Sequence, residues 1–262
     1  MGLLDRAFLT IKWGAEFNPD DVNTLKRAAF ANTSFKTRFI CLTDDRKGLD
    51  ADIETFPIPE FELYHKTPKK GIWPKISLFH PDISDIAKLV VFLDIDTVVC
   101  GCLDEFFDDP HDNLMLLSCG PRWVNMDPLL PPHAATGIMA YRPAFQTHIF
   151  KIFHQDIIEF TSQFTVEQEF VGFAAEKVNY FPVQWVESFK YHLRQGYLVD
   201  LIKPPSMPKG TTKLVAFHGF PRPRDVADQN LSWARPPRSG FHRPKWVINY
   251  FNSYSDQVVK PF

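Results

Sequence analysis

Unbroken apolar runs, rather than alternating ones, dominate the first half of the chain. Residues 7–12, 38–43 and 88–93 each form such a run, and polar residues follow each one. A short run of this kind is typical of a strand buried on both faces, as in a parallel sheet that helices cover on both sides. The pattern therefore predicts an α/β fold with a mostly parallel, Rossmann-like central sheet flanked by helices.

Helical periodicity is strongest at two places. Asn18-Pro19-Asp20-Asp21 combines an N-cap residue, a first-turn proline and two first-turn acids, and it predicts a helix that runs to about Asn32. A second stretch carries apolar residues on one helical face and predicts a single helix. These residues are Phe145, Ile149, Ile152, Phe153, Ile157 and Phe160.

Three further strands are predicted at residues 113–119, 137–141 and 214–217, and the pattern loosens after Tyr180. Residues 220–244 are rich in Pro and Arg, so they form either a flap over a site or a poorly ordered segment within an irregular tail. We find no internal repeat. Residues 1–262 are expected to form one domain built on one continuous sheet.

Composition removes several classes of function. The formal net charge of −2 with interspersed signs argues against a nucleic-acid partner. No stretch approaches the roughly 20 uninterrupted apolar residues of a membrane helix, and the start lacks a signal-peptide pattern, so the expected location is the cytoplasm. Without Cys-x-x-Cys spacing, the four cysteines are interpreted as reduced core residues. They are Cys41, Cys100, Cys102 and Cys119.

The strongest chemical pattern is Asp94-Ile95-Asp96, at the point where a buried strand gives way to a loop. Two carboxylates there suit a divalent cation that also bridges phosphates, and burying their charge is costly unless a cation or hydrogen bonds compensate it. A plainer interpretation is that Asp94 and Asp96 cap a turn and accept backbone amides.

A second enzyme class shares this pattern. Asp94-Ile95-Asp96-Thr97-Val98 also fits haloacid-dehalogenase phosphatases, in which the first Asp is a nucleophile and the second a general acid. Those enzymes carry the motif in the first strand of their core domain and need a later acidic pair after a Gly. No later Gly-Asp-x-x-x-Asp is present in this sequence.

Several short motifs, taken in order, resemble the family-8 type of glycosyltransferase, the group that includes glycogenin and bacterial galactosyltransferases. The resemblance covers most of the chain, and each motif alone is weak. The motifs are Leu9-Thr10-Ile11-Lys12-Trp13-Gly14, Val22-Asn23-Thr24-Leu25, Phe39-Ile40-Cys41-Leu42-Thr43-Asp44-Asp45, Gly71-Ile72-Trp73-Pro74-Lys75-Ile76-Ser77-Leu78-Phe79, Phe92-Leu93-Asp94-Ile95-Asp96-Thr97, Thr136-Gly137-Ile138-Met139, Glu167-Gln168 and His218-Gly219-Phe220-Pro221-Arg222-Pro223.

The resemblance implies a GT-A-type domain and a metal site. Asp94, Asp96 and His218 would hold Mn²⁺ or Mg²⁺ against the two phosphates of a nucleotide-sugar donor, and manganese accepts such a mixed oxygen and nitrogen shell. Taken alone, His218 is as consistent with a packing histidine as with a metal ligand. The implied division is a donor half at 1–110 and an acceptor half at 111–262 that carries the C-terminal metal and phosphate loop.

The resemblance also implies donor contacts. Lys75 would lie over the pyrophosphate or the sugar, the loops carrying Thr10, Lys12 and Asp44 or Asp45 would hold the uridine, and Gly219 belongs to the phosphate loop. Glu167 and Gln168 stand where the family has Asp-Gln near the sugar and acceptor, although a surface acid pair without a role fits the pattern equally well.

One departure from the family is visible after His218-Gly219. Members often have Lys-Pro-Trp there, whereas this chain has Arg222-Pro223-Arg224. Arg is a competent phosphate ligand, but the sequence does not say which arginine acts.

The activity implied is transfer of a hexose from a UDP-sugar to a saccharide or glycolipid acceptor, with retention of configuration. A polysaccharide pathway with peripheral membrane association is consistent with it by analogy only. A nucleotide-sugar-binding protein without turnover is the alternative from a different class.

Overall fold

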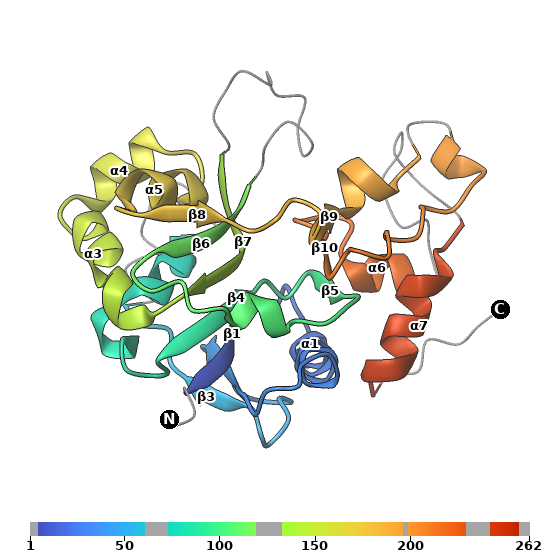
Figure 1. Cartoon of the computed structure of the whole chain (residues 1–262), viewed down its shortest axis with the longest axis horizontal. Helices are drawn as coiled ribbons and strands as arrows, with labels where there is room; N and C mark the ends of the chain where they lie inside the picture. Colours follow the sequence, from blue (N-terminus) through green and yellow to red (C-terminus); the bar gives the residue numbers. More distant parts are fainter. Residues whose placement is uncertain (1–4, 61–72, 119–132, 196–198, 229–241, 257–262) are drawn as a thin grey trace.

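The computed structural model describes residues 5–60, 73–118, 133–195, 199–228 and 242–256. Within these ranges, a seven-stranded sheet with the order β3-β2-β1-β4-β7-β6-β8 forms the centre of the molecule (Figure 1). Its strands are β1 (Arg6–Lys12), β2 (Arg38–Thr43), β3 (Glu54–Phe56), β4 (Leu89–Leu93), β6 (Leu114–Ser118), β7 (Ala134–Tyr141) and β8 (Val178–Tyr180).

The pairing of these strands is mixed but mostly parallel. β1 pairs in parallel with β2 and β4, β2 with β3, and β6 with β8, while β7 runs antiparallel to β4 and β6. The three strands predicted from unbroken apolar runs are therefore neighbours, and the predicted α/β class with a mostly parallel sheet is confirmed.

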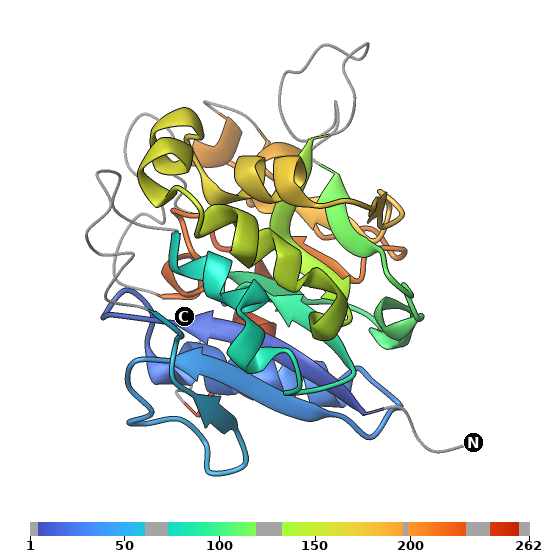
Figure 2. The ribbon, with the colours of Figure 1, turned by 90° about the vertical axis from the view of Figure 1, so that its left-hand side faces the viewer.

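Helices cover both faces of this sheet. Alternate residues of β1 divide between two cores: Phe8 packs with helices α1 (Pro19–Ala31) and α7 (Lys245–Tyr254), whereas Ala7 and Leu9 face the other side. That second side is covered by the 3-10 helix η1 (Trp73–Phe79) with α3 (Pro143–Phe153) and α5 (Glu167–Ala174). Figure 2 shows α3, α4 (Ile157–Gln163) and α5 grouped on one side. Burial on both faces explains why the strand sequences do not alternate.

A second, three-stranded sheet lies beside the central one, so the prediction of one continuous sheet is wrong. It contains β5 (Thr97–Val99), β9 (Val186–Ser188) and β10 (Leu214–Ala216) in the order β5-β10-β9. The chain turns at Asp94-Ile95-Asp96 after β4 and re-emerges as β5, which pairs antiparallel with β10. The predicted strand at 214–217 therefore exists, but it joins the smaller sheet.

The helix predicted across Phe145 to Phe160 is two helices, α3 and α4. The break has a local cause, because the Asp156 carboxylate accepts a hydrogen bond from the backbone N–H of Glu159 at 2.9 Å and so caps a new helix. Phe145 lies outside the core with 53% of its surface exposed. The N-terminal helix agrees with its prediction: α1 starts at Pro19, and the Asn18 N–H donates to the Asp21 carboxylate at 2.9 Å.

The C-terminal part is more regular than its composition suggests. Instead of an irregular tail, its described residues form the short helix α6 (Pro223–Ala227) and α7, while residues 229–241 lie outside the described ranges. The remaining short helices are η2 (Pro81–Ile83), η3 (Asp104–Phe107), η4 (Phe189–Leu193) and η5 (Val199–Leu201). Across the described ranges, no helix has the length and apolarity needed to cross a membrane.

The described cysteines are reduced, as predicted, but only one of the three is a core residue. The three described cysteines are free thiols, and Cys41 is buried in β2, but Cys100 and Cys102 are exposed. Both follow the end of β5, where the backbone N–H groups of Cys100 and Gly101 turn toward the Lys213 carbonyl. Cys119 and the Gly71-Ile72 pair lie outside the described residues.

Candidate active site

A cavity of about 420 Å³ opens where strands β1 and β4 end. Crevices beyond the carboxyl ends of strands are the usual ligand sites of open α/β sheets. Five segments build its walls: the end of β1 with the loop after it, η1, the Asp94 turn, the start of α5 and the loop after β10. The lining residues are Ile11, Trp13, Glu16, Phe17, Lys75, Asp94, Ile95, Asp96, Val166, Glu167, Gln168, His218, Gly219 and Arg222.

The Asp94 turn is fixed by backbone hydrogen bonds to both sheets. The Asp94 N–H donates to the Gly137 carbonyl of β7 at 2.9 Å, and the Phe217 N–H after β10 donates to the Asp96 carbonyl at 3.1 Å. The Thr97 N–H closes the turn on the Asp94 carbonyl at 3.1 Å. Both carboxylates are thus held on rigid backbone at the junction of the two sheets.

Lys75 lies between two carboxylates on one wall of the cavity. Its ammonium donates to the Asp94 carboxylate at 2.8 Å and lies 3.4 Å from Glu167 Oε1, with only 9% of the side chain exposed. Thr136 of β7 donates to the same Glu167 oxygen at 2.6 Å. Burial lowers the pKa of Lys75, but the charges of Asp94 and Glu167 outweigh it and raise that pKa, so the lysine is a permanent cation.

Asp96 is held from the opposite side, by the loop after β10. The Gly219 N–H donates to its carboxylate at 2.8 Å. Gly219 has φ +90°, a left-handed conformation that favours glycine, and His218 before it has φ +38°. This strained pair of residues turns the loop back over Asp96, which explains why a Gly follows the histidine.

His218 is held by contacts with Ser188, Tyr191 and Lys190. Its Nε2 lies 2.6 Å from the Ser188 hydroxyl, its ring stacks on Tyr191, and its carbonyl accepts from Lys190 Nζ at 2.7 Å. Burial and the Lys190 charge lower the pKa of His218 to about 4. The imidazole can therefore donate a lone pair at neutral pH without first losing a proton.

The two aspartates carry more negative charge than their protein partners neutralise. Burial and, to a smaller extent, the Asp96 charge outweigh the lowering effect of Lys75 and together raise the pKa of Asp94 to about 7. The pKa of Asp96 is also raised by burial, although the Gly219 N–H opposes the shift. A cation between the two carboxylates would remove this penalty.

The donor set fits a divalent ion in its chemistry. Asp94, Asp96 and His218 line the same cavity, and two carboxylates with a neutral imidazole suit Mn²⁺. Among the described residues, no three such side chains are already gathered at metal-binding distances. The Asp94 carboxylate accepts a hydrogen bond from Lys75, and His218 Nε2 is hydrogen-bonded to the Ser188 hydroxyl. Both side chains would therefore have to give up these partners in order to bind a metal ion.

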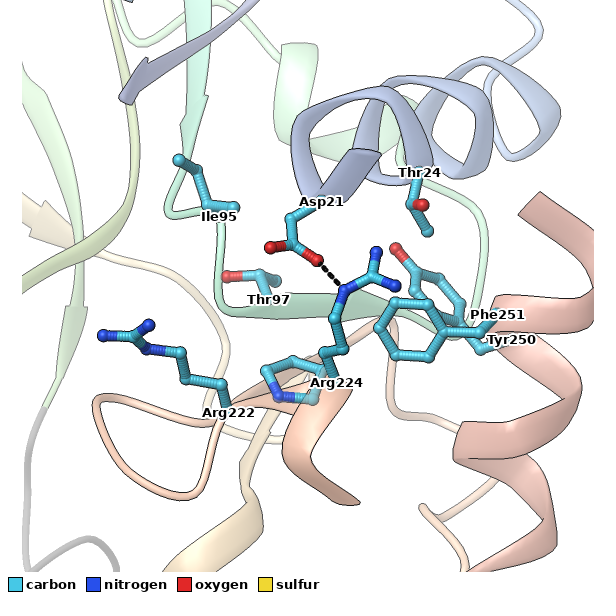
Figure 3. Close-up of a pocket in the computed structure, with 9 residues that line it drawn as sticks. Asp21, Thr24, Ile95, Thr97, Arg222, Arg224, Tyr250 and Phe251 are labelled. Carbon is cyan, nitrogen blue, oxygen red and sulfur yellow. Dashed lines mark hydrogen bonds and ion pairs between the residues drawn. The ribbon is translucent and has the colours of Figure 1, made fainter. Parts of the chain in front are cut away.

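Arg222 and Arg224, the two arginines of the motif that differs from the family pattern, lie in different places. Arg222 lines the cavity, where its guanidinium contacts Glu16 and lies 4.4 Å from the Phe17 ring centroid. Arg224 points away, into ion pairs with Asp20 and Asp21 at 2.7 and 2.5 Å. Figure 3 shows the two side chains diverging, with Arg224 joined to Asp21. Of the two arginines, Arg222 is therefore the one whose side chain lines the large cavity.

Four predicted donor-binding residues lie outside the set that lines the cavity. Thr10 is fully buried and donates to the Leu93 carbonyl at 2.8 Å, which ties β1 to β4. The Lys12 ammonium donates to the Gly14 carbonyl, and the Gly14 N–H donates to Asp44 at 3.0 Å. Asp45 accepts the Lys47 N–H. Lys12 and Asp44 thus fix the Gly14 turn, from which the cavity-lining loop continues.

Several lining residues were not predicted. Trp13, Glu16 and Phe17 follow β1, and only Trp13 belonged to a quoted motif. Ser188 and Lys190 reach His218 from a region where the sequence pattern loosens. A polar cluster directly after a three-residue strand gives little periodic signal, so only the fold reveals it.

No protein-family model and no curated protein matches this sequence. Solved structures do match it. The galactosyltransferase LgtC, solved with donor and acceptor sugar analogues, is 12% identical with a TM-score of 0.60, covering 96% of this chain and 97% of its own. An active-site mutant of LgtC is 13% identical with a TM-score of 0.61, at the same coverage.

Two other enzymes share the architecture. The bifunctional glycosyltransferase WbbM is 12% identical with a TM-score of 0.59, and 96% of this chain matches half of that protein. Mouse xyloside xylosyltransferase 1 is 11% identical with a TM-score of 0.52, covering 82% of this chain and 98% of its own. At such identities the similarity establishes the fold, which confirms the GT-A-type architecture that the sequence resemblance implied.

Proposed function

We propose that the protein is a metal-dependent glycosyltransferase that moves a hexose from a UDP-sugar to a saccharide or glycolipid acceptor. The observation that carries the proposal is the composition of the cavity on this fold. Asp94, Asp96 and His218 offer ligands to a divalent ion, while Lys75 and Arg222 are cations on the same walls. The matched folds give no support to the phosphatase hypothesis.

The chemical problem in such a transfer is departure of a nucleoside diphosphate. A bound Mn²⁺ or Mg²⁺ held by Asp94, Asp96 and His218 would neutralise the developing charge on that leaving group. Arg222 would form hydrogen bonds with the diphosphate, because its guanidinium forks onto phosphate oxygens. The contact of Arg222 with the exposed Glu16 is weak enough to be exchanged for this ligand.

Lys75 and Glu167 are assigned to the sugar side of the cavity. Lys75 is held between Asp94 and Glu167. If a metal ion bound Asp94, the Lys75 ammonium would be available to contact a sugar hydroxyl or a bridging phosphate oxygen. Glu167 and Gln168 begin α5 and would bind hydroxyl groups of donor and acceptor. Retention of configuration, a donor half at 1–110 and an acceptor half at 111–262 form part of the same proposal.

The aromatic loop after β1 offers the apolar part of the site. Trp13 and Phe17 line the cavity together with Ile11, and rings of this kind pack against a nucleobase or a sugar face. Lys12 and Asp44 act on the donor indirectly, through the Gly14 turn.

Calorimetric titration of UDP tests the proposal. With Mn²⁺ present, binding is expected in the wild type and in Asp112→Asn, a control that removes an exposed carboxylate paired with Lys177. It is expected to vanish with chelator and in Asp94→Asn with Asp96→Asn. Screening UDP-hexoses for donor hydrolysis then separates an enzyme from a binding protein. No UDP binding under any condition, or an aspartyl phosphate at Asp94, would overturn the proposal.

A further inference from the structure

The segment that follows strand β9 lies directly against the loop that follows strand β10. The two strands pair in parallel with Ser188 opposite Ala216, so the chain leaves both of them side by side. After β9 it forms η4, a π-helical turn in which the Arg194 N–H donates to the Phe189 carbonyl at 3.1 Å. The Phe189 ring stacks on Phe217, with centroids 4.2 Å apart. Turns of this kind are rare and occur frequently at functional sites.

Three residues of this segment contact His218. The Ser188 hydroxyl lies 2.6 Å from His218 Nε2, and the Tyr191 ring stacks on the imidazole with centroids 5.5 Å apart. The Lys190 ammonium donates to the His218 backbone carbonyl at 2.7 Å. Two of these contacts therefore act on the side chain of His218, and the contact of Lys190 acts on its backbone.

The backbone at this point needs an external hold. His218 has φ +38° and Gly219 has φ +90°. A residue other than glycine persists in the left-handed region only where its surroundings fix it there. The half-buried Lys190 ammonium packs on this pair of residues, since a Cβ built on Gly219 would lie 3.6 Å from Nζ.

One peptide group connects Lys190 to Asp96. The carbonyl of the peptide between His218 and Gly219 accepts from Lys190, and the N–H of the same peptide donates to the Asp96 carboxylate at 2.8 Å. The orientation of this peptide therefore decides both hydrogen bonds together. A rotation that takes the carbonyl away from the ammonium also takes the N–H away from Asp96.

We propose that Lys190 is a positioning residue that orients the peptide between His218 and Gly219 for metal binding. By holding the carbonyl, it sets the left-handed turn that presents the His218 imidazole and aims the N–H at Asp96. This inference rests on the proposed function, in which Asp96 and His218 are metal ligands. The lysine itself acts through the loop and is not among the residues that line the cavity.

The charge of Lys190 alone would have the opposite effect on a metal ion. Burial raises the pKa of Asp96, whereas the Gly219 N–H and the charges of Lys75 and Lys190 lower it, so Lys190 acts on this carboxylate electrostatically. A cation beside a metal site repels the ion, so losing the ammonium without any change in the loop would tighten metal binding. Positioning predicts weaker binding, and the sign of the change separates the two roles.

Calorimetric titration with Mn²⁺ alone measures that sign. Lys190→Met removes the ammonium, and it is expected to raise the Kd for Mn²⁺ about tenfold, as is usual when a group that orients a metal ligand is lost. Lys190→Arg keeps a donor for the carbonyl and is expected to restore most of the affinity. Lys177→Met is the control for loss of an exposed lysine, and its Kd should equal that of the wild type. An unchanged or lower Kd in Lys190→Met would overturn the proposal.

A second measurement needs no metal. Hydrogen exchange of the Gly219 amide, followed by NMR, reports the peptide orientation, because this N–H donates to Asp96. Exchange is expected to be about tenfold faster in Lys190→Met, with the β10 amides protected as in the wild type, and Lys190→Arg should keep the protection. Equal protection of Gly219 in wild type and Lys190→Met would overturn the proposal. A wild type that binds no Mn²⁺ would instead overturn the proposed function, and the Gly219 amide would still decide whether Lys190 holds the loop.

Discussion

Lys75 and Arg224 are each held between two carboxylates, and the supply of hydrogen-bond donors differs between the two clusters. At the back of the molecule, Arg224 binds Asp20 and Asp21, and Asp20 also accepts from Ser255 and from the Asp256 N–H. At the cavity, Lys75 binds Asp94 and Glu167, while Asp96 beside them accepts from Gly219.

The difference is clear between Asp20 and Asp94, whereas burial raises the pKa of Asp21 despite its contact with Arg224. Ser255, the Asp256 N–H and Arg224 together lower the pKa of Asp20 against the opposing effect of burial, as expected for a carboxylate well supplied with donors. Burial instead raises the pKa of Asp94 to about 7, which indicates a carboxylate short of positive charge. Carboxylates left in that state at the edge of a cavity are candidates for binding a cation.

The largest expected effect is on catalysis. Asp94→Asn or Asp96→Asn should lower sugar transfer by about 100-fold or more, because metal and electrostatic stabilisation of the leaving group would be lost. Tm should hold or rise for Asp96→Asn, whose carboxylate is disfavoured by burial, and should fall for Asp94→Asn, because the buried Lys75 loses one of its two carboxylates. Steady-state kinetics with differential scanning fluorimetry would measure both. A large fall in Tm together with full activity would contradict the comparison.

Arg224→Gln should act in the opposite way, on stability. Removing the guanidinium leaves Asp20 and Asp21 partly buried, each with 12% of the side chain exposed, and should lower the free energy of unfolding by about 2–4 kcal/mol. Urea unfolding would measure the loss, and kcat should change little below the transition. Arg27→Gln is a matched control, because Arg27 also pairs with two carboxylates and is not among the residues that line the cavity.

Metal affinity should depend on pH through Asp94. Its folded pKa, about 7, lies above its ordinary value of 3.8, so the metal-free fold binds more protons than the unfolded chain between these values. Metal-free stability contributed by this group therefore falls as pH rises from about 4 to about 7.

Manganese binds the deprotonated form, so its Kd should fall about tenfold per pH unit up to pH 7 and then level off. His218 adds no step in that range, because its pKa of about 4 keeps it neutral. Calorimetry from pH 5.5 to 8 would test this, and a Kd that is flat below pH 7 would exclude Asp94 as a ligand.

The smallest effect is expected at Arg222. Arg222→Lys keeps the positive charge but loses the paired hydrogen-bond donors of the guanidinium, so KM for the donor should rise a few-fold. Arg222→Gln also removes the charge and should raise this KM by about tenfold. Tm should hardly move, because its partner Glu16 is exposed. Equal effects of Arg222→Gln and Arg224→Gln on KM would show that the two arginines do not have separate tasks.

The sequence predicted an element correctly where its residue pattern is compatible with only one local structure. The apolar runs of β1, β2 and β4 are buried on both sides, so the pattern was enough to identify them as strands of a helix-covered sheet. The capped start of α1 at Asn18 was equally local. The prediction of a single helix from Phe145 to Phe160 was wrong. The helical spacing of apolar residues continues through the break between α3 and α4, whereas the hydrogen bond that Asp156 accepts from the Glu159 N–H starts a new helix there.

The candidate site was predictable only in part for a similar reason. Asp94, Asp96, Lys75, Glu167, Gln168, His218, Gly219 and Arg222 do line one cavity. Thr10, Lys12 and Asp44 instead form hydrogen bonds with backbone groups. The sequence does not distinguish the two cases, because a polar residue near the end of a strand can contact either a ligand or the backbone of an adjacent segment. Arg222 and Arg224 are two residues apart, and only the placement of α1 sends the second to Asp20 and Asp21.

The single side chain between the two aspartates has a consequence of its own. Ile95 lines both the large cavity and a second cavity of about 20 Å³, which Asp21, Thr24, Tyr250 and Phe251 also line. Its branched, apolar side chain therefore stands between the ligand cavity and the place where α1 and α7 meet β5. A smaller residue at this position would widen the passage between the two spaces, and Arg222 would then be the remaining side chain that lines both.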